Sequence, residues 1–332
     1  MRPVGYGRTA QSHGTPRPRG RAEGAYGVPS QYGRGAYGSA ARAAQGGKKG
    51  GSPWRVVFIV SIVVLIAALA ALGGIVYQYW AQQNAYNELD QYANVSEADA
   101  GTVALSDLSV DWASLKAINP DIVAWVYVPG TVINYPVVQG TDNDEYLHKA
   151  FDGSTGWLAS AGTIFLDAGN APDFSDRNSA LYGHHMNDGS MFASLANLND
   201  QTQFDEHRDI YVLTPQGNYH LKSFALVDTV GTDAIVQTSF ATDGDYRAYL
   251  QDKIDRSVVT QSGDVFSASD IKQSMLLSTC EYSQTDGRAV LFAAVVETTV
   301  ANDPWLGASS QAQTTLGQDE NAQLDSDYKE AA

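Results

Sequence analysis

The sequence has 332 residues, of which 44% are hydrophobic, a proportion that is ordinary for one or two globular domains. Its formal net charge is −16 and it contains a single cysteine, which excludes an internal disulfide. The charge is unevenly distributed: ten Lys or Arg and one acid precede residue 56, whereas eleven Lys or Arg and thirty-six acids follow it. Such an asymmetry is a signal of membrane topology.

Residues 1–55 are basic and poor in aliphatic side chains. A segment of Gly, Ala, Arg, Ser, Tyr, Pro and Gln cannot bury enough apolar area to offset its chain entropy, so we expect a disordered cytoplasmic tail. Its Tyr-Gly and Arg-Gly content resembles that of nucleic-acid-binding tails. Because a membrane span follows, a solvated tail is the favoured interpretation, and no nucleic-acid partner is expected.

Residues 56–77 are uncharged and almost entirely apolar. At a rise of about 1.5 Å per residue, a helix of this length crosses a hydrocarbon core of about 30 Å. Arg55 flanks its start and Trp80 follows its end, which predicts a cytoplasmic N-terminal side and an extracellular remainder. A cleaved signal peptide is disfavoured, since the apolar run is too long and follows a long tail. We therefore predict a single-pass type II anchor in the cell membrane.

The remaining chain divides into three parts by composition. Residues 78–110 are polar and acidic and are expected to form an extracellular stalk, residues 111–302 a catalytic domain, and residues 303–332 a flexible acidic tail. Within the domain, short β-type runs alternate with turn residues, which indicates a barrel or a sandwich. Helical spacing is confined to Trp112–Ile118 and Asp243–Ile254. The predicted strands are 122–128, 133–138, 163–166, 180–182, 209–213, 219–230, 275–279 and 289–296.

The one cysteine, Cys280, follows an apolar run, and Arg288 begins the next run after a turn. Two strands joined in this way would bring the thiol close to the guanidinium. A thiol needs a base or an electrostatic partner to act as a thiolate, and the candidate base lies in Tyr182-Gly183-His184-His185, where a strand runs into a polar loop. Adjacent histidines point to opposite faces of an extended segment, and no partner set has ligand spacing, so neither a metal nor another cofactor is predicted.

These motifs, taken in order, resemble those of the sortases, the membrane-anchored cysteine transpeptidases of Gram-positive bacteria, and class B most of all. The similar region covers residues 111–299, and the helix predicted at 243–254 also resembles class B. His185 departs from the pattern, because the class more often has asparagine there; His184 is chosen because it follows Tyr-Gly. The matching motifs are 118–121, 128–140, 142–147, 182–184 and 277–280, followed by Arg288.

The resemblance implies a mainly β fold, an eight-stranded sortase-type barrel with added helices, preceded by one transmembrane helix. It implies that the Cys280 thiolate attacks a carbonyl in the C-terminal sorting signal of a secreted protein. Arg288 would donate hydrogen bonds to the oxyanion or the substrate, and His184 would protonate the leaving amine. An amine of a peptidoglycan precursor, or a pilin lysine, would then resolve the thioester. The residues implied to line the substrate groove are Asn143, Leu147, Tyr182, Ser278 and Glu281.

Three other functions remain open at this point. In a papain-like protease the nucleophile precedes the histidine, whereas here His184 precedes Cys280. A membrane-tethered binding module would not need the thiol. A pilin-polymerising sortase often carries an Asp-Pro-aromatic lid before its barrel, whereas Asp303-Pro304-Trp305 lies after it. Cys280 could also be a buried apolar residue, Tyr182 and Leu147 core residues, and Ser278 and Glu281 surface residues of an edge strand.

Overall fold

The computed structural model describes residues 53–95, 104–156, 159–281 and 287–307, with the backbone alone at Tyr79, Cys280 and Glu281. The predicted disordered tail up to residue 52 and the acidic tail from residue 308 lie outside the described residues. The chain divides into two units, Met1–Phe58 and Ile59–Ala332. Of the first unit, only the opening residues of helix α1 are described, and the features below belong to the second.

Helix α1 spans Pro53–Asn87 and contains the apolar segment predicted to cross a membrane. Its most apolar stretch is not buried by the rest of the chain, and its length and composition are sufficient for a membrane span. The orientation and the extracellular placement of the following residues stay predictions.

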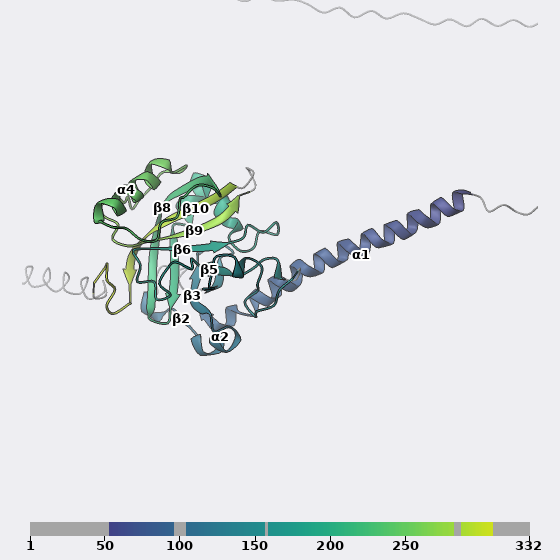
Figure 1. The fold of residues 1–332 in the computed structure, drawn as a ribbon, viewed down its shortest axis with the longest axis horizontal. Coiled ribbons are helices and arrows are strands. Elements are labelled where there is room, and N and C mark those ends of the chain that lie inside the picture. The colour runs from purple at the N-terminus through teal and green to yellow at the C-terminus, as the bar shows by residue number, and fades with distance from the viewer. Residues whose placement is uncertain (1–52, 96–103, 157–158, 282–286, 308–332) are drawn as a thin grey trace, which may run out of the picture. The chain divides into compact units, whose positions relative to one another are not determined.

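Eight strands close into a barrel in the order β10-β8-β7-β3-β4-β5-β6-β9 (Figure 1). The predicted barrel is therefore confirmed, and a sandwich is excluded. Most neighbours are antiparallel, but β4–β5 and β6–β9 are parallel pairs. The strands are β3 (Ile122–Tyr127), β4 (Asn134–Val138), β5 (Ile164–Leu166), β6 (Asn178–Gly183), β7 (Asp209–Thr214), β8 (Gly217–Val230), β9 (Ser274–Glu281) and β10 (Gly287–Thr298).

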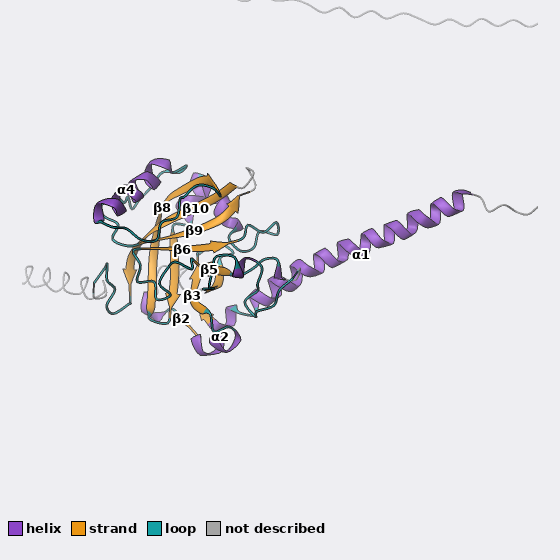
Figure 2. Cartoon of the chain, viewed as in Figure 1, coloured by secondary structure: helices purple, strands orange, loops and turns teal. Residues whose placement is uncertain are grey.

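Both predicted helices of the domain are present (Figure 2). Each has a side chain that caps its start. The carboxylate of Asp111 accepts a hydrogen bond from the Ser114 amide at the start of α2, and the Thr242 hydroxyl caps α4. The helices are α2 (Trp112–Ile118), α3 (Gln201–Glu206) and α4 (Asp243–Arg256), with short 3-10 turns η1 (Asp90–Tyr92), η3 (Leu105–Asp107), η4 (Glu145–Leu147) and η6 (Ala193–Asn199). Two short strands, β1 (Ala93–Asn94) and β2 (Ser109–Val110), pair with each other.

The barrel strands are buried on both faces where α4 covers them. Along β10, Leu291 packs in the cluster that fills the barrel, while Val290 and Phe292 pack in a second cluster with Tyr246 and Leu250 of α4. This alternation is the period-two geometry of a strand. The two clusters hold β8, β9 and β10 firmly in register, which matters because the candidate site lies at the ends of β9 and β10.

The residues predicted to form a stalk contribute to the barrel core. Tyr86 and Leu89 at the end of α1 and its continuation are buried, as are Val95 and Leu105. The Tyr86 ring meets the Tyr135 ring edge-on, with centroids 5.6 Å apart. The domain boundary at residue 111 stays a prediction. The polar composition of residues 78–110 gave no sign of this packing, because only a few widely spaced side chains make it.

Candidate active site

Strand pairing brings the predicted catalytic residues to one end of three neighbouring strands. The Cα of Cys280 in β9 faces that of Arg288 in β10, and Thr279 faces Gly183 at the end of β6. Facing residues of an antiparallel pair lie about 4.5–5.5 Å apart at their Cα atoms. His184 follows Gly183 directly. The backbone therefore places the sulfur-bearing residue between the histidine and the arginine.

A cavity of about 230 Å³ opens at this point. It gathers six of the eight residues predicted from the sequence, while the side chains of the other two, Cys280 and Glu281, lie outside the described part of the structure. Their backbone continues β9 immediately after two lining residues, Ser278 and Thr279. The lining residues are Asn143, Asp144, Leu147, Phe165, Tyr182, Gly183, His184, Ser278, Thr279 and Arg288.

The imidazole of His184 is held by a backbone carbonyl. Its Nε2 lies 2.7 Å from the carbonyl oxygen of Leu147, and its ring stacks on that of His148 with centroids 5.8 Å apart. A carbonyl can only accept, so Nε2 carries the proton and the neutral ring keeps its lone pair on Nδ1. Burial lowers the pKa of His184 below its ordinary value; the bond to Leu147 opposes this effect, and the charge of His148 adds to it.

Replacing His148 with alanine is expected to raise the pKa of His184. The substitution removes the electrostatic effect by which His148 lowers the pKa of His184, and it uncovers one face of the ring; both changes favour the imidazolium. An NMR titration of the His184 ring in the full-length protein measures the shift. His207→Ala is the matched control, because His207 bonds to the Pro129 carbonyl instead. An unchanged or lower pKa in the His148 variant would contradict this account of the site.

The structure distinguishes the two adjacent histidines. His184 lines the cavity, whereas His185 is not among the residues that line it and forms an isolated bridge with Met191. Gly183, which precedes the two histidines, packs tightly against Ile164 and Phe192: a Cβ at this position would lie 2.4 Å from Ile164 and 2.8 Å from Phe192. A larger residue there would push the strand end, and His184 with it, out of place.

Arg288 brings an unused hydrogen-bond donor to the site. Its Nε is buried and makes no hydrogen bond to any described residue, although the residue lines the cavity. Buried donors are rarely left without a partner, and such exceptions often mark ligand-binding or catalytic positions. The positive charge of Arg288 also acts on the Tyr182 hydroxyl, where it opposes the rise in pKa that burial causes. The guanidinium is thus placed to stabilise a negative charge in the cavity.

Comparison with known proteins gives the family. A family model for the sortase domain matches residues 126–296. Sortase B of Staphylococcus aureus is 36% identical over 186 residues, which cover 55% of this chain and 74% of that protein. Sortase B of Listeria monocytogenes is 32% identical over 233 residues, which cover 67% of this chain and 92% of that protein. This chain belongs to the sortase family, class B.

Solved structures agree with this assignment. A substrate complex of S. aureus sortase B has a TM-score of 0.54 and 31% identity, and the alignment covers 64% of this chain and 95% of that one. The same enzyme complexed with triglycine also has a TM-score of 0.54 and 31% identity, with 64% and 96% covered. Class B sortases are cysteine transpeptidases, so the papain-like and non-enzymatic alternatives are set aside.

Two groove residues of this sortase share one carboxylate. The Tyr182 hydroxyl donates to Oδ2 of Asp167 at 2.9 Å, and the Asn143 amide donates to the same oxygen at 3.0 Å. The Asn143 carbonyl oxygen in turn accepts from the Ala168 amide at 2.8 Å. Asp167 thereby fixes both side chains. Sequence reasoning missed Asp167, and the available signal was only that a buried tyrosine hydroxyl requires an acceptor.

Two further predicted groove residues, Leu147 and Ser278, line the cavity. Ser278 is buried in β9, and its Cα pairs with that of Tyr182 in β6 and that of Val290 in β10. Because β9 has a neighbouring strand on each side here, Ser278 is not a surface residue of an edge strand. Leu147 and Tyr182 pack partly against the core and also line the cavity. Within the described residues, no group of three or more His, Cys, Asp or Glu is arranged to hold a metal ion.

Proposed function

We propose that this sortase cleaves a C-terminal sorting signal of secreted proteins and transfers the acyl group to an amine of a cell-wall precursor, outside the membrane. The observation that carries the proposal is the single cavity lined by His184 and Arg288, with the Cα of Cys280 directly opposite Arg288. The membrane-crossing part of the proposal is supported by the exposed apolar helix α1 and its basic N-terminal flank.

The proposed reaction has two halves. The Cys280 thiolate attacks the scissile carbonyl carbon, and the carbonyl π electrons move onto oxygen, where Arg288 donates hydrogen bonds. As the C–N bond breaks, the His184 imidazolium gives its proton to the leaving amine and a thioester remains. The incoming amine then attacks the thioester, the now neutral His184 accepts a proton, and the thiolate leaves.

The lowered pKa of His184 has a direct consequence for this scheme. The imidazolium needed for acylation is the minor form at neutral pH, because the pKa lies below the ordinary value of the side chain. The neutral form needed to accept a proton from the incoming amine is then abundant. Deacylation by an amine is accordingly favoured by the same burial that limits acylation.

The groove residues support recognition of a peptide. Asp167 holds Asn143 and Tyr182 on one side of the cavity, and Ser278 lies on the β9 side. We propose that these residues, with Leu147 and Glu281, bind the sorting signal. The substrate and triglycine complexes of S. aureus sortase B support a peptide substrate and an amine acceptor in general.

The decisive experiment is product analysis with the full-length protein in detergent. Candidate sorting-signal peptides from secreted proteins are incubated without an acceptor, with triglycine, or with a lysine-containing pilin peptide, and the products are identified by mass spectrometry. An amide-linked triglycine product supports the proposal. Release of a free carboxylate despite abundant triglycine would identify a hydrolase, and transfer only to a pilin lysine would identify a pilin polymerase.

Arg288→Ala is expected to lower the acylation rate by about 10²–10³, the usual effect of removing one oxyanion donor. Arg288→Lys should recover only part of the rate, because lysine keeps the charge but lacks the planar fork. Stopped-flow measurement of thioester formation checks both values. Arg247→Ala, an exposed substitution on α4, is the control that should retain the wild-type rate. A wild-type rate in the Arg288→Ala protein would remove this residue from the mechanism.

A further inference from the structure

We propose that Tyr86, near the end of α1, is a positioning residue that fixes His184 through the connection between β4 and β5. The inference rests on the proposed role of His184 and adds a residue that lies before the first of the matching sequence motifs, residues 118–121. The connection runs from residue 139 to residue 163 and lies between the candidate membrane helix and the active site.

The first link is the bond between the connection and the imidazole. Leu147 ends the short turn η4 within the connection, and its carbonyl oxygen receives the Nε2–H of His184 at 2.7 Å. A backbone carbonyl moves only when its segment of chain moves. The position of the ring therefore depends on what holds the segment around Leu147 in place.

The second link is the close approach of Gly162 to that carbonyl. Gly162 has a φ of +58°, and a Cβ at this position would lie 2.5 Å from the carbonyl oxygen of Leu147 and 2.6 Å from that of Tyr146. The following amide, that of Thr163, donates to the Tyr146 carbonyl at 3.0 Å. The two ends of the connection are thus packed directly against each other, and any shift of Gly162 is passed to the Leu147 carbonyl.

The third link joins this pair to α1. The Tyr86 hydroxyl donates to the Gly162 carbonyl and lies 3.3 Å from the Thr163 hydroxyl. One helical turn earlier, the side-chain amides of Gln82 and Gln78 donate to the Ser160 hydroxyl at 3.2 and 2.7 Å. Side chains on one face of α1 therefore bind consecutive parts of the same connection.

Packing and hydrogen bonds together hold α1 to this connection. A cavity of about 330 Å³ lies between part of the helix and the connection, lined by Tyr86 and Leu89 on one side and by Phe151 and Gly162 on the other. The Tyr86 ring packs in the barrel core, and its hydroxyl adds the bond to the Gly162 carbonyl. Removing its hydroxyl should loosen the connection without emptying a packed core.

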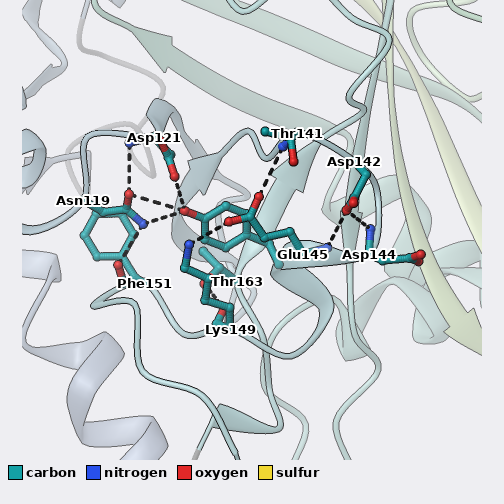
Figure 3. A network of polar contacts seen from close by, with 10 residues as sticks. Asn119, Asp121, Thr141, Asp142, Asp144, Glu145, Lys149, Phe151 and Thr163 are labelled. Atoms are coloured by element: carbon teal, nitrogen blue, oxygen red, sulfur yellow. Dashed lines mark hydrogen bonds and ion pairs between the residues drawn. The ribbon is translucent and has the colours of Figure 1, made fainter.

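Figure 3 shows a separate network of polar contacts, within the connection and from it to Asn119 and Asp121, which precede β3. The Tyr146 hydroxyl donates to Asp121 at 2.6 Å and is contacted by the Asn119 amide at 3.1 Å. Lys149 pairs with Glu145 at 2.8 Å. Because these bonds do not involve α1, loss of the Tyr86 hydroxyl is expected to displace the Leu147 carbonyl modestly and leave the fold intact.

The test compares Tyr86→Phe with Tyr92→Phe in the full-length protein in detergent. Tyr92 lines the same cavity, and its hydroxyl makes no hydrogen bond to another described residue, so it is a matched control. Loss of one buried hydrogen bond is expected to lower kcat about five- to tenfold in Tyr86→Phe, with KM for the sorting peptide unchanged. The NMR signals of the His184 ring should shift in this variant and stay in place in Tyr92→Phe. Thr163→Val, which removes the second partner of the Tyr86 hydroxyl, should act in the same direction.

The outcomes separate this inference from the proposed function. If the wild-type protein forms the thioester but Tyr86→Phe and Thr163→Val keep both the wild-type kcat and the wild-type His184 signals, the positioning role is wrong and the function stands. A fall in kcat with unmoved His184 signals would also overturn it, because the effect would not pass through the ring. If the wild-type protein forms no adduct with any sorting peptide, the function itself fails.

Discussion

Replacing Cys280 with alanine is expected to abolish the covalent adduct between this sortase and a sorting-signal peptide, and all turnover with it. The acyl-enzyme is a thioester, so without the sulfur the bond cannot form at all. Cys280→Ser should also form no detectable adduct, because a serine hydroxyl is a far weaker nucleophile near neutral pH unless a strong base activates it. Intact-mass measurement of the full-length protein after incubation with the peptide gives the result directly.

The sequence makes this experiment easy to interpret. Cys280 is the only cysteine in the chain, so a single mass addition of a thiol reagent reports this one residue. Methanethiosulfonate reagents should modify the wild-type protein once and both variants not at all. An adduct that survives in Cys280→Ala would place the nucleophile elsewhere. A wild-type thiol that resists the reagent in the folded protein would instead favour the buried apolar alternative.

His184→Ala is expected to have the next largest effect, a loss of about 10²–10⁴ in turnover, which is the usual contribution of general acid–base catalysis. His184 lines the cavity, and its ring is oriented by the Leu147 carbonyl. The neighbouring substitution His185→Ala is the control, since His185 is absent from the cavity lining. Steady-state rates of transfer to triglycine, measured for both variants, compare two chemically identical changes at adjacent positions.

A second measurement shows which step His184 serves. Loss of the general acid should slow thioester formation, whereas loss of the base should slow transfer from a preformed thioester. Both rates should fall in His184→Ala and neither in His185→Ala. If instead His185→Ala is inactive and His184→Ala turns over normally, the wrong ring has been chosen, and the bond to Leu147 has no catalytic meaning.

Structural features that depend on neighbouring residues were well predicted from the sequence. Short apolar runs bounded by turn residues predicted the strands to within a few residues, as with β3, expected at 122–128 and found at Ile122–Tyr127. Helical spacing predicted the start of α4 at Asp243, and the helix ends at Arg256, two residues later than expected. Helix α3 was missed because its six residues are too few to show a helical period. Chain order also predicted that Cys280 and Arg288 lie opposite each other, as their Cα atoms do in the adjacent strands β9 and β10.

Residues that act through distant partners could not be predicted in this way. Asp167 contacts side chains fifteen and twenty-four positions away, and Tyr86 contacts a residue seventy-six positions away. None of these sequence separations follows the periodicity of a helix or a strand, and neither Asp167 nor Tyr86 belongs to a recognisable motif. The stalk prediction shows the same limit, because composition averages over residues 78–110 and conceals the few side chains that enter the core.

Periodicity and short motifs are properties of neighbouring residues, so the strands, the membrane-helix candidate, the family resemblance and the candidate sulfur, imidazole and guanidinium could all be predicted from the chain. The folded structure was needed to show that His184 rather than His185 lines the cavity, that Asp167 holds Asn143 and Tyr182, and that α1 is bonded to the segment behind the imidazole. These contacts exist because closing an eight-stranded barrel brings loops from separate strand pairs to the same rim, and that closure depends on all the strands at once.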